Sequence, residues 1–197
     1  MTAFVDHNNR RNLILEASFK LFALEGFEGV TFRKIADSCG ISRTLIYRYF
    51  KDKEQIFLYA VKQGTDKMSA VVRKVMDRND LSVLERLRRI LHLTVKLLSE
   101  NRVFLSVILD YLAIQKQAGT NVRRKVRRFT FGMKFLIERL IREAVAENLL
   151  SESQPIKAAG HLFSLLEACV LNLTVIEVMD WRDYLPLIDS YIDEKKV

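Results

Sequence analysis

The stretch from Thr31 to Lys53 constrains the fold of this chain most, because it contains two short helical patterns separated by a tight turn. The first pattern places apolar residues at intervals of three or four, at Phe32, Ile35, Ala36 and Cys39. Gly40 follows, where a helix C-terminus favours a residue that tolerates a left-handed backbone, and Ser42 is a good N-cap for a new helix. This arrangement predicts a helix-turn-helix, whose second helix enters the DNA major groove.

The second helix is expected to begin near Ser42 and to have two different faces. Ile46 and Phe50 are four residues apart and should pack inward. The side chains expected to address bases or phosphates are Arg43, Thr44, Leu45, Tyr47 and Arg48. A glycine turn also occurs in ordinary helical bundles, and in that case Arg43 and Arg48 would belong to a solvated face.

Residues upstream extend the pattern with a further apolar stripe and a glycine. The ordered set covers roughly residues 10–60 and comprises Ile14, Ala17, Leu21, Phe22, Gly26, Thr31, Ile35, Ala36, Gly40, Ile41, Ser42, Tyr47, Phe50 and Lys53. This set resembles the DNA-binding domain of the tetracycline-repressor (TetR) family of transcriptional regulators. The chain length and the helical character of the remainder also fit that family.

The resemblance implies roles for individual residues. Thr31 would hold a phosphate at the start of its helix, Tyr47 would contact the DNA backbone or a base, and Lys53 would grip a phosphate. Arg33, Ser42 and Tyr49 complete the set that we expect at the DNA.

Two positions depart from the common pattern of the family. Thr44 and Leu45 stand where many members have Gly-Thr, and Tyr49 stands where a histidine is frequent. Leu45 cannot donate a hydrogen bond, but it could pack against a thymine methyl group. The base preference of relatives therefore cannot be carried over to this chain.

Composition predicts an all-α fold. Of the 197 residues 49% are hydrophobic and only two are prolines, and no stretch shows sustained strand alternation bounded by turn signals. We expect a three-helix DNA-binding domain over residues 1–53 and a helical domain over residues 54–197, which the resemblance makes an effector-binding and dimerisation domain. The helices expected in the second domain cover residues 54–76, a segment ending near 99, and residues 103–117, 122–148, 155–179 and 181–195.

Charge is unevenly distributed along the chain. Residues 1–53 carry nine Lys/Arg against six Asp/Glu, residues 54–128 carry sixteen against seven, and residues 129–197 carry seven against eleven. The basic excess favours association with a polyanion, whereas the acidic last third suits a partner interface better. The densest basic cluster, Arg123 to Arg128, could serve DNA, an acidic ligand or solubility alone.

Three segments are rich in Phe, Leu and Ile, namely Phe104–Ile114, Phe129–Ile141 and Leu162–Val178. They could line a cavity for an apolar effector, or they could simply form a core and a dimer interface. The polar residues that we select as candidate ligand contacts are His92, Asp110, Tyr111, Glu167 and Asn172. Each of them could equally be a buried group with its hydrogen bonds made inside the chain, or it could lie at a dimer interface.

A single short recognition helix reads few base pairs, whereas two copies related by a twofold axis read a palindrome. As in the resembling family, we expect a homodimer that pairs the last two helices with their symmetry mates. The small residues Ala158, Ala159 and Gly160 would permit close approach, and a charge at Leu166 or Leu173 should weaken the dimer.

Other classes of protein lack support in the sequence. It shows no Gly-rich phosphate loop, no cluster of metal ligands and no catalytic constellation, so we expect neither an enzyme nor a cofactor. Cys39 and Cys169 lie in apolar helical patterns, as structural cysteines do. Without a signal-peptide core or an apolar run long enough for a bilayer, we expect a cytoplasmic protein with no membrane partner.

These features together predict a homodimeric transcriptional repressor. It would bind a palindromic operator in double-stranded DNA and be released by a small apolar effector. The alternative keeps the same DNA-binding fold in an activator or in a regulator that needs no ligand.

Overall fold

The structure is a computed structural model that describes the backbone of residues 2–120 and 122–197 and the side chains of residues 9–120 and 132–197. The described chain is helical, without any strand beyond one isolated bridge between Leu150 and Lys196, which confirms the all-α prediction. The α-helices are α1 (Thr2–Gly29), α2 (Phe32–Cys39), α3 (Arg43–Tyr47), α4 (Lys53–Met76), α5 (Val83–Glu100), α6 (Arg102–Gln117), α7 (Val122–Ala146), α8 (Pro155–Leu171) and α9 (Tyr184–Asp193).

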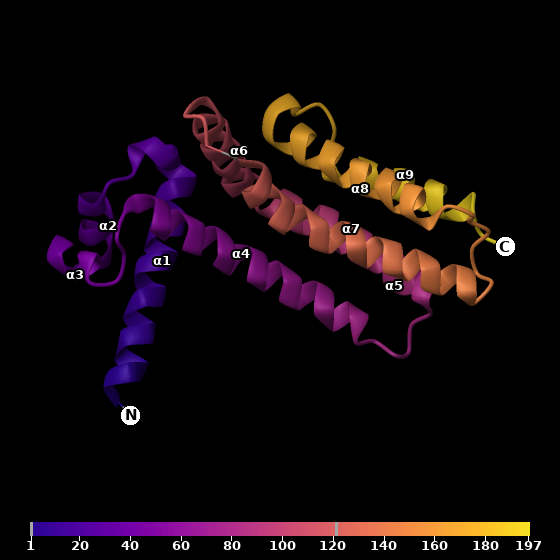
Figure 1. Cartoon of the computed structure of the whole chain (residues 1–197), viewed down its shortest axis with the longest axis horizontal. Coiled ribbons are helices and arrows are strands. Elements are labelled where there is room, and N and C mark those ends of the chain that lie inside the picture. Colours follow the sequence, from indigo (N-terminus) through magenta and orange to yellow (C-terminus); the bar gives the residue numbers. More distant parts are fainter. Residues whose placement is uncertain (1, 121) are drawn as a thin grey trace.

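Two hydrophobic cores lie at opposite ends of α4 (Figure 1). Helices α1 to α3 form one end, which we call the head, and α5 with α7 to α9 form the other, which we call the body. Helix α6 packs against α1 and adds Phe104, Val107 and Tyr111 to the head core. The hydroxyl of Tyr111 donates a hydrogen bond to Glu54 Oε1 at 2.5 Å, so α6 also contacts the start of α4.

Helix α4 packs against other helices at its two ends, but no side chain in its middle is buried. Its first turns bury Ile56, Phe57, Ala60 and Val61 in the head core, and its last turns bury Val72 in the body core. None of the residues from 62 to 71 is buried. The middle of α4 therefore spans the distance between the two cores with little apolar packing of its own.

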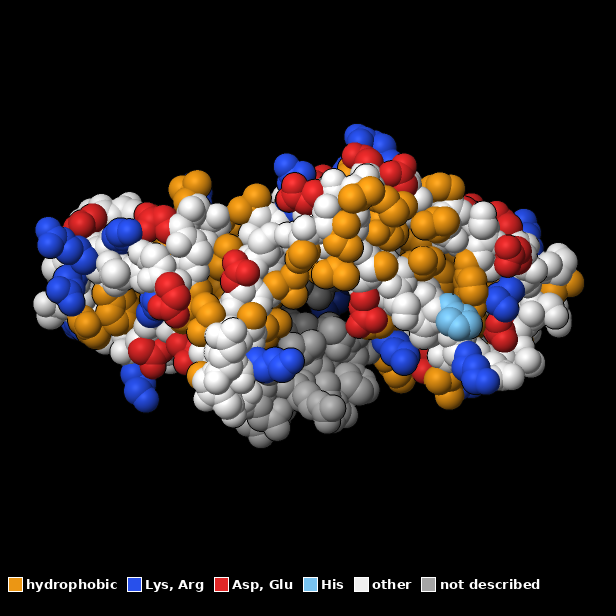
Figure 2. Space-filling model, turned by 90° about the horizontal axis from the view of Figure 1, so that it is seen from above, with side chains coloured by type: hydrophobic (Ala, Val, Ile, Leu, Met, Phe, Trp, Pro, Cys, Tyr) orange, Lys and Arg blue, Asp and Glu red, His pale blue; other side chains and the backbone are white. Residues whose placement is uncertain are grey.

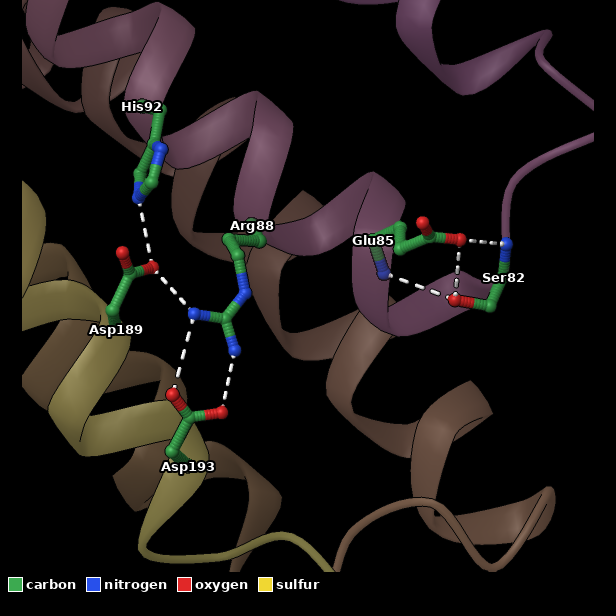
Figure 3. Close-up of polar contacts among 6 residues, drawn as sticks. All are labelled: Ser82, Glu85, Arg88, His92, Asp189 and Asp193. Atoms are coloured by element: carbon green, nitrogen blue, oxygen red, sulfur yellow. Dashed lines mark hydrogen bonds and ion pairs between the residues drawn. The ribbon is translucent and has the colours of Figure 1, made fainter.

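A network of ion pairs joins α5 to α9 (Figure 3). The Arg88 guanidinium contacts Asp189 at 2.7 Å and Asp193 at 2.6 Å. His92 Nε2 lies 2.8 Å from Asp189 Oδ1. The terminal helix is thus held to the centre of the body by polar contacts as well as by the core.

Helix α8 and the π-helical turn that follows it, Asn172–Ile176, are apolar over an unusual length. By length and composition alone the described segment Pro155–Ile176 could cross a membrane, with a mean hydropathy of 1.6. The expectation that no run reaches this length was therefore wrong. The core helix of a soluble protein can have the same length and hydropathy, so these two properties do not distinguish a membrane helix from a buried one.

One face of α8 packs into the body core, and the other is open. Leu166 and Leu173, the predicted seam positions, are both buried in the core of the chain itself. Ala158 and Ala159 are buried there too. The exposed large apolar side chains of this region lie on the opposite face and in the turn after it, at Ile156, Leu171, Val175, Ile176, Val178 and Met179.

Both cysteines have the structural setting that the sequence predicts. Cys169 is fully buried, and burial raises the pKa of its thiol to about 11. Cys39 is half-buried at the end of α2, and partial desolvation raises its pKa as well, against a smaller lowering by Ser38. Both thiols are therefore protonated at neutral pH and are weak nucleophiles.

Candidate nucleic-acid interface

The turn between α2 and α3 follows the predicted geometry. Thr31 Oγ1 accepts a hydrogen bond from Lys34 N at 3.3 Å and caps α2. Gly40 ends the helix in a left-handed conformation, with φ 62° and ψ 34°. The next amide, Ile41 N, then donates to Ala36 O at 3.1 Å, which closes the turn.

Replacing Gly40 with Ala should destabilise the head by about 1 kcal/mol, because an L-residue is strained at positive φ. The added Cβ would meet no atom within 4 Å, so the effect would come from the backbone alone. A Cβ added at Gly132, inside α7, would likewise meet no atom within 4 Å, but there φ is not positive. Gly132→Ala should therefore stabilise the chain by roughly 0.5–1 kcal/mol. Denaturant unfolding of both variants measures these opposite signs, and two shifts of the same sign would contradict the assignment.

Helix α3 is short and firmly seated. Ser42 Oγ accepts a hydrogen bond from Leu45 N at 3.2 Å and caps it, as predicted. Ile46 and Phe50 are buried in the head core, which confirms the inward face. The helix itself ends at Tyr47, so Phe50 reaches the core from the turn that follows.

The opposite side of α3 is exposed to solvent and carries four of the predicted contacts. Exposed side chains there are Arg43, Thr44, Tyr47 and Arg48. Tyr47 keeps 53% of its surface exposed while its ring meets Phe32 edge to face at 4.5 Å. Leu45 and Tyr49 are half-buried, and Tyr49 packs against the head core. The exposed group offers hydroxyl, phenol and guanidinium donors on one surface, as a DNA reader requires.

Two further predicted residues lie on the helices before and after α3. Arg33 is exposed on α2 and lies 3.9 Å from Asp37. Lys53, at the start of α4, places its Nζ 3.5 Å from the Glu28 carboxylate and 4.4 Å from the centre of the Phe27 ring. The Lys53 ammonium is thus positioned by the end of α1.

A long groove lies between α4 and α7, with α5 beneath it. Its volume is about 1560 Å³. One wall is the bare side of α4 from Gln55 to Asp77, the other is α7 from Gly132 to Arg139, and Thr94 and Leu97 of α5 form the floor. Of the three segments expected to line a cavity, only Phe129–Ile141 contributes described residues to this groove.

None of the five predicted ligand contacts lines the groove. His92 belongs to the α5–α9 network, and Tyr111 belongs to the head core. Asp110 is exposed on α6, and Glu167 is exposed on the outer face of α8. The lining residues that sequence reasoning missed lie on α4 and, at the floor of the groove, on α5; neither helix carried a signal of a cavity in its sequence.

Asn172, the fifth candidate, holds the turn between α8 and α9. Its Nδ2 donates to Met179 O at 2.6 Å, and its Oδ1 accepts from Val178 N at 3.2 Å and Met179 N at 3.1 Å. The turn includes Glu177 at a positive φ of 54°, a conformation that needs such support.

Asn172→Ala should cost roughly 2 kcal/mol of unfolding free energy, because it removes a buried amide that makes three hydrogen bonds to the backbone of the turn. Thr174→Ala is a matched control two residues away, since its hydroxyl donates a hydrogen bond only to Val170 O, four residues earlier in the chain. Urea unfolding should show a small loss for the control and a large one for Asn172→Ala. Equal stability of the two variants would mean that Asn172 is retained for another reason.

The basic cluster Arg123 to Arg128 lies outside the described side chains. Among the described residues, no group of three or more His, Cys, Asp or Glu side chains could hold a metal ion.

Comparison with known proteins agrees with this geometry. The family model described as "Bacterial regulatory proteins, tetR family" matches residues 14–60. The HTH-type transcriptional repressor AcnR of Corynebacterium diphtheriae is 40% identical over 63 residues, which are 32% of this chain and 33% of AcnR. The chain thus matches only about a third of the length of this curated relative.

Solved structures extend the likeness of fold over nearly the whole chain. A TetR transcription regulator from Haloarcula marismortui is 15% identical with a TM-score of 0.81, covering 96% of this chain and 100% of its own. A regulator of the TetR/AcrR family from Thermobifida fusca is 21% identical with a TM-score of 0.71, covering 93% and 96%.

The fold and the exposed face of α3 are those of a helix-turn-helix DNA-binding protein. In its N-terminal segment, residues 14–60, the chain is similar to the tetR family of bacterial regulatory proteins. The relatives are transcriptional regulators and not enzymes, as the sequence predicted.

Proposed function

We propose that this protein is a homodimeric transcriptional repressor that acts in the cytoplasm and binds a palindromic operator. The observation that carries the proposal is the exposed face of α3, where Arg43, Thr44, Tyr47 and Arg48 project from a helix whose other face is locked into the head core. Thr31, Arg33 and Lys53 would hold phosphates on either side of it. Such contacts fix the register of a protein on DNA, while the residues of α3 read bases.

The open face of α8 supports the dimer. Figure 2 shows hydrophobic side chains gathered over the half of the molecule where α8 and α9 lie. Leu171 is 48% exposed and Val175 is 65% exposed, four residues further along. Gly160, Ser164 and Ala168 follow one another at spacings of four, and Ala168 precedes Leu171 by three, so they lie on the same side of the helix; small side chains permit close helix contact. A second copy of the chain would cover this face.

The groove supports an effector site, because its head end contacts the DNA-binding elements. Gln55 lines the groove, and its side-chain oxygen accepts a hydrogen bond from Lys51 N at 2.7 Å in the loop after α3. Tyr59 also lines it, and the guanidinium of Arg11 on α1 lies 4.2 Å from its ring centre. A ligand that displaces Gln55 or Tyr59 would disturb the seating of the head.

Helix α4 would transmit the change. A second hollow of about 400 Å³ lies along it toward α1, and Met68 and Leu97 line both spaces. The bare middle of α4 therefore has room on two sides. An effector that favours one position of α4 would change the separation of the two recognition helices, which on DNA is roughly 34–36 Å.

A reporter gene tests the direction of regulation. A promoter overlapping the bound site should lose expression when the protein is present and regain it with the Tyr47→Ala/Arg48→Ala variant. Increased expression with the native protein would instead identify an activator.

A further inference from the structure

The charges around the groove identify a class of ligand for it. This inference rests on the proposed effector site and concerns what that site would bind. The groove is long: at about 1.5 Å per residue, its α4 wall from Gln55 to Asp77 extends about 33 Å. Its volume of about 1560 Å³ exceeds the roughly 300–1,000 Å³ typical of small-molecule pockets. An extended molecule suits this shape better than a compact one.

The inner surface of the groove is mainly apolar and rich in flexible side chains. The central lining residues are Met68, Val72, Met76, Leu97, Met133 and Leu136. Methionine side chains adapt to irregular apolar ligands because they are unbranched and polarizable. This part of the groove would therefore accept an alkyl chain without strict demands on its shape.

The rim carries an excess of positive charge. Lys62 and Asp66 neutralise each other at 2.5 Å. Arg73 and Arg139 also line the groove, and neither has a charged partner among the described residues. Asp77 is the one unpaired acid that faces them along the described lining. A guanidinium is a planar fork of donors that matches a carboxylate or a phosphate.

We propose that the groove binds an amphipathic anion. Its alkyl chain would lie along the methionine-rich surface, and its carboxylate or phosphate would bind Arg73 and Arg139. Arg73 is in the last turn of α4, so the anionic head would lie away from the DNA-binding helices. The chain would then extend toward Tyr59 and Gln55, the residues that contact the head of the protein.

Displacement of N-phenyl-1-naphthylamine, a neutral dye that fluoresces in apolar surroundings, tests the proposal on the full-length protein. The competitors share a ten-carbon chain and differ in the head group: decanoate, decyl phosphate, decan-1-ol and decyltrimethylammonium. We expect the better of the two anions to displace the dye at a roughly tenfold lower concentration than the alcohol. The order of the two anions distinguishes a carboxylate from a phosphate ligand.

Variants locate the charge effect. Arg73→Gln combined with Arg139→Gln should abolish the advantage of the anions and leave displacement by decan-1-ol unchanged. The matched control combines Lys74→Gln and Arg142→Gln, which remove the same charge from the same helices at positions outside the groove lining. This control should bind all four competitors as the native protein does.

A third variant shows whether the dye occupies the groove. Gly132→Phe introduces a ring where a Cβ meets no atom within 4 Å, and it should reduce dye binding at least fivefold. Dye binding that Gly132→Phe does not reduce would overturn the effector site itself. If Gly132→Phe blocks the dye but all four competitors are equally effective, or if the control pair also removes the preference, the site remains and the anionic ligand is refuted.

Discussion

Leu171→Glu is expected to separate the proposed dimer into monomers. The side chain lies on the open face of α8, so the substitution would bury a carboxylate in each half of the proposed interface. Burying an unpaired charge costs several kcal/mol, and a loss of about 3 kcal/mol already weakens association on the order of a hundredfold. Operator affinity should fall with it, because a monomer contacts one half-site. Sedimentation velocity and operator titration on the same samples measure both effects.

Two other substitutions make this test specific. Leu24→Glu introduces the same charge at an exposed apolar residue of α1, and it should leave the dimer intact. Leu166→Glu places the charge in the core of the chain itself and should unfold it rather than dissociate it. A folded, fully dimeric Leu171→Glu protein would remove α8 from the interface.

The Tyr47→Ala/Arg48→Ala variant should lose most of its operator affinity while staying folded. Each base or phosphate contact of this kind contributes roughly 1–3 kcal/mol, and a dimer makes every contact twice. Both side chains are exposed, so the free energy of unfolding should change little beyond the contact of Tyr47 with Phe32. Fluorescence anisotropy with a labelled operator, beside a denaturant titration, gives the two quantities.

Two control variants separate the loss of specific DNA contacts from the loss of positive charge in general. Tyr47→Phe keeps the ring on Phe32 and removes only the hydroxyl, so its affinity reports the hydroxyl alone. Arg142→Ala removes an equal charge from the exposed surface of α7 and should scarcely alter binding. Undiminished operator affinity of Tyr47→Ala/Arg48→Ala would refute the assignment of α3 as the recognition helix.

The head could be predicted from sequence because its determinants are local. Gly40 and Ser42 act on residues no more than four positions away, and their conformations follow from backbone sterics and capping. Ile46 and Phe50 were correctly placed for the same reason, since a helical period fixes their common face.

The body was less predictable because its determinants are distant in sequence. Tyr111 was predicted to contact a ligand, but it is buried in the head core because α6 packs on α1. Leu166 was predicted to lie at the dimer interface, but it is buried in the body core because α5 and α7 cover it. The groove exists because the middle of α4 does not pack against the helices of the body. The spacing of apolar residues within α4 does not indicate this separation. The role of Asn172 could not be predicted from sequence, because the backbone groups to which its side chain hydrogen-bonds lie in a turn, and a turn has no regular spacing of residues.

Selection of bound duplexes from a random DNA pool, with the purified protein at moderate salt, tests the central claim most directly. The account predicts recovery of a palindrome whose two half-sites are about one helical turn apart, and its loss with Tyr47→Ala/Arg48→Ala. Recovery of no common sequence, with weak binding that falls steeply as salt rises, would contradict a site-specific dimeric regulator.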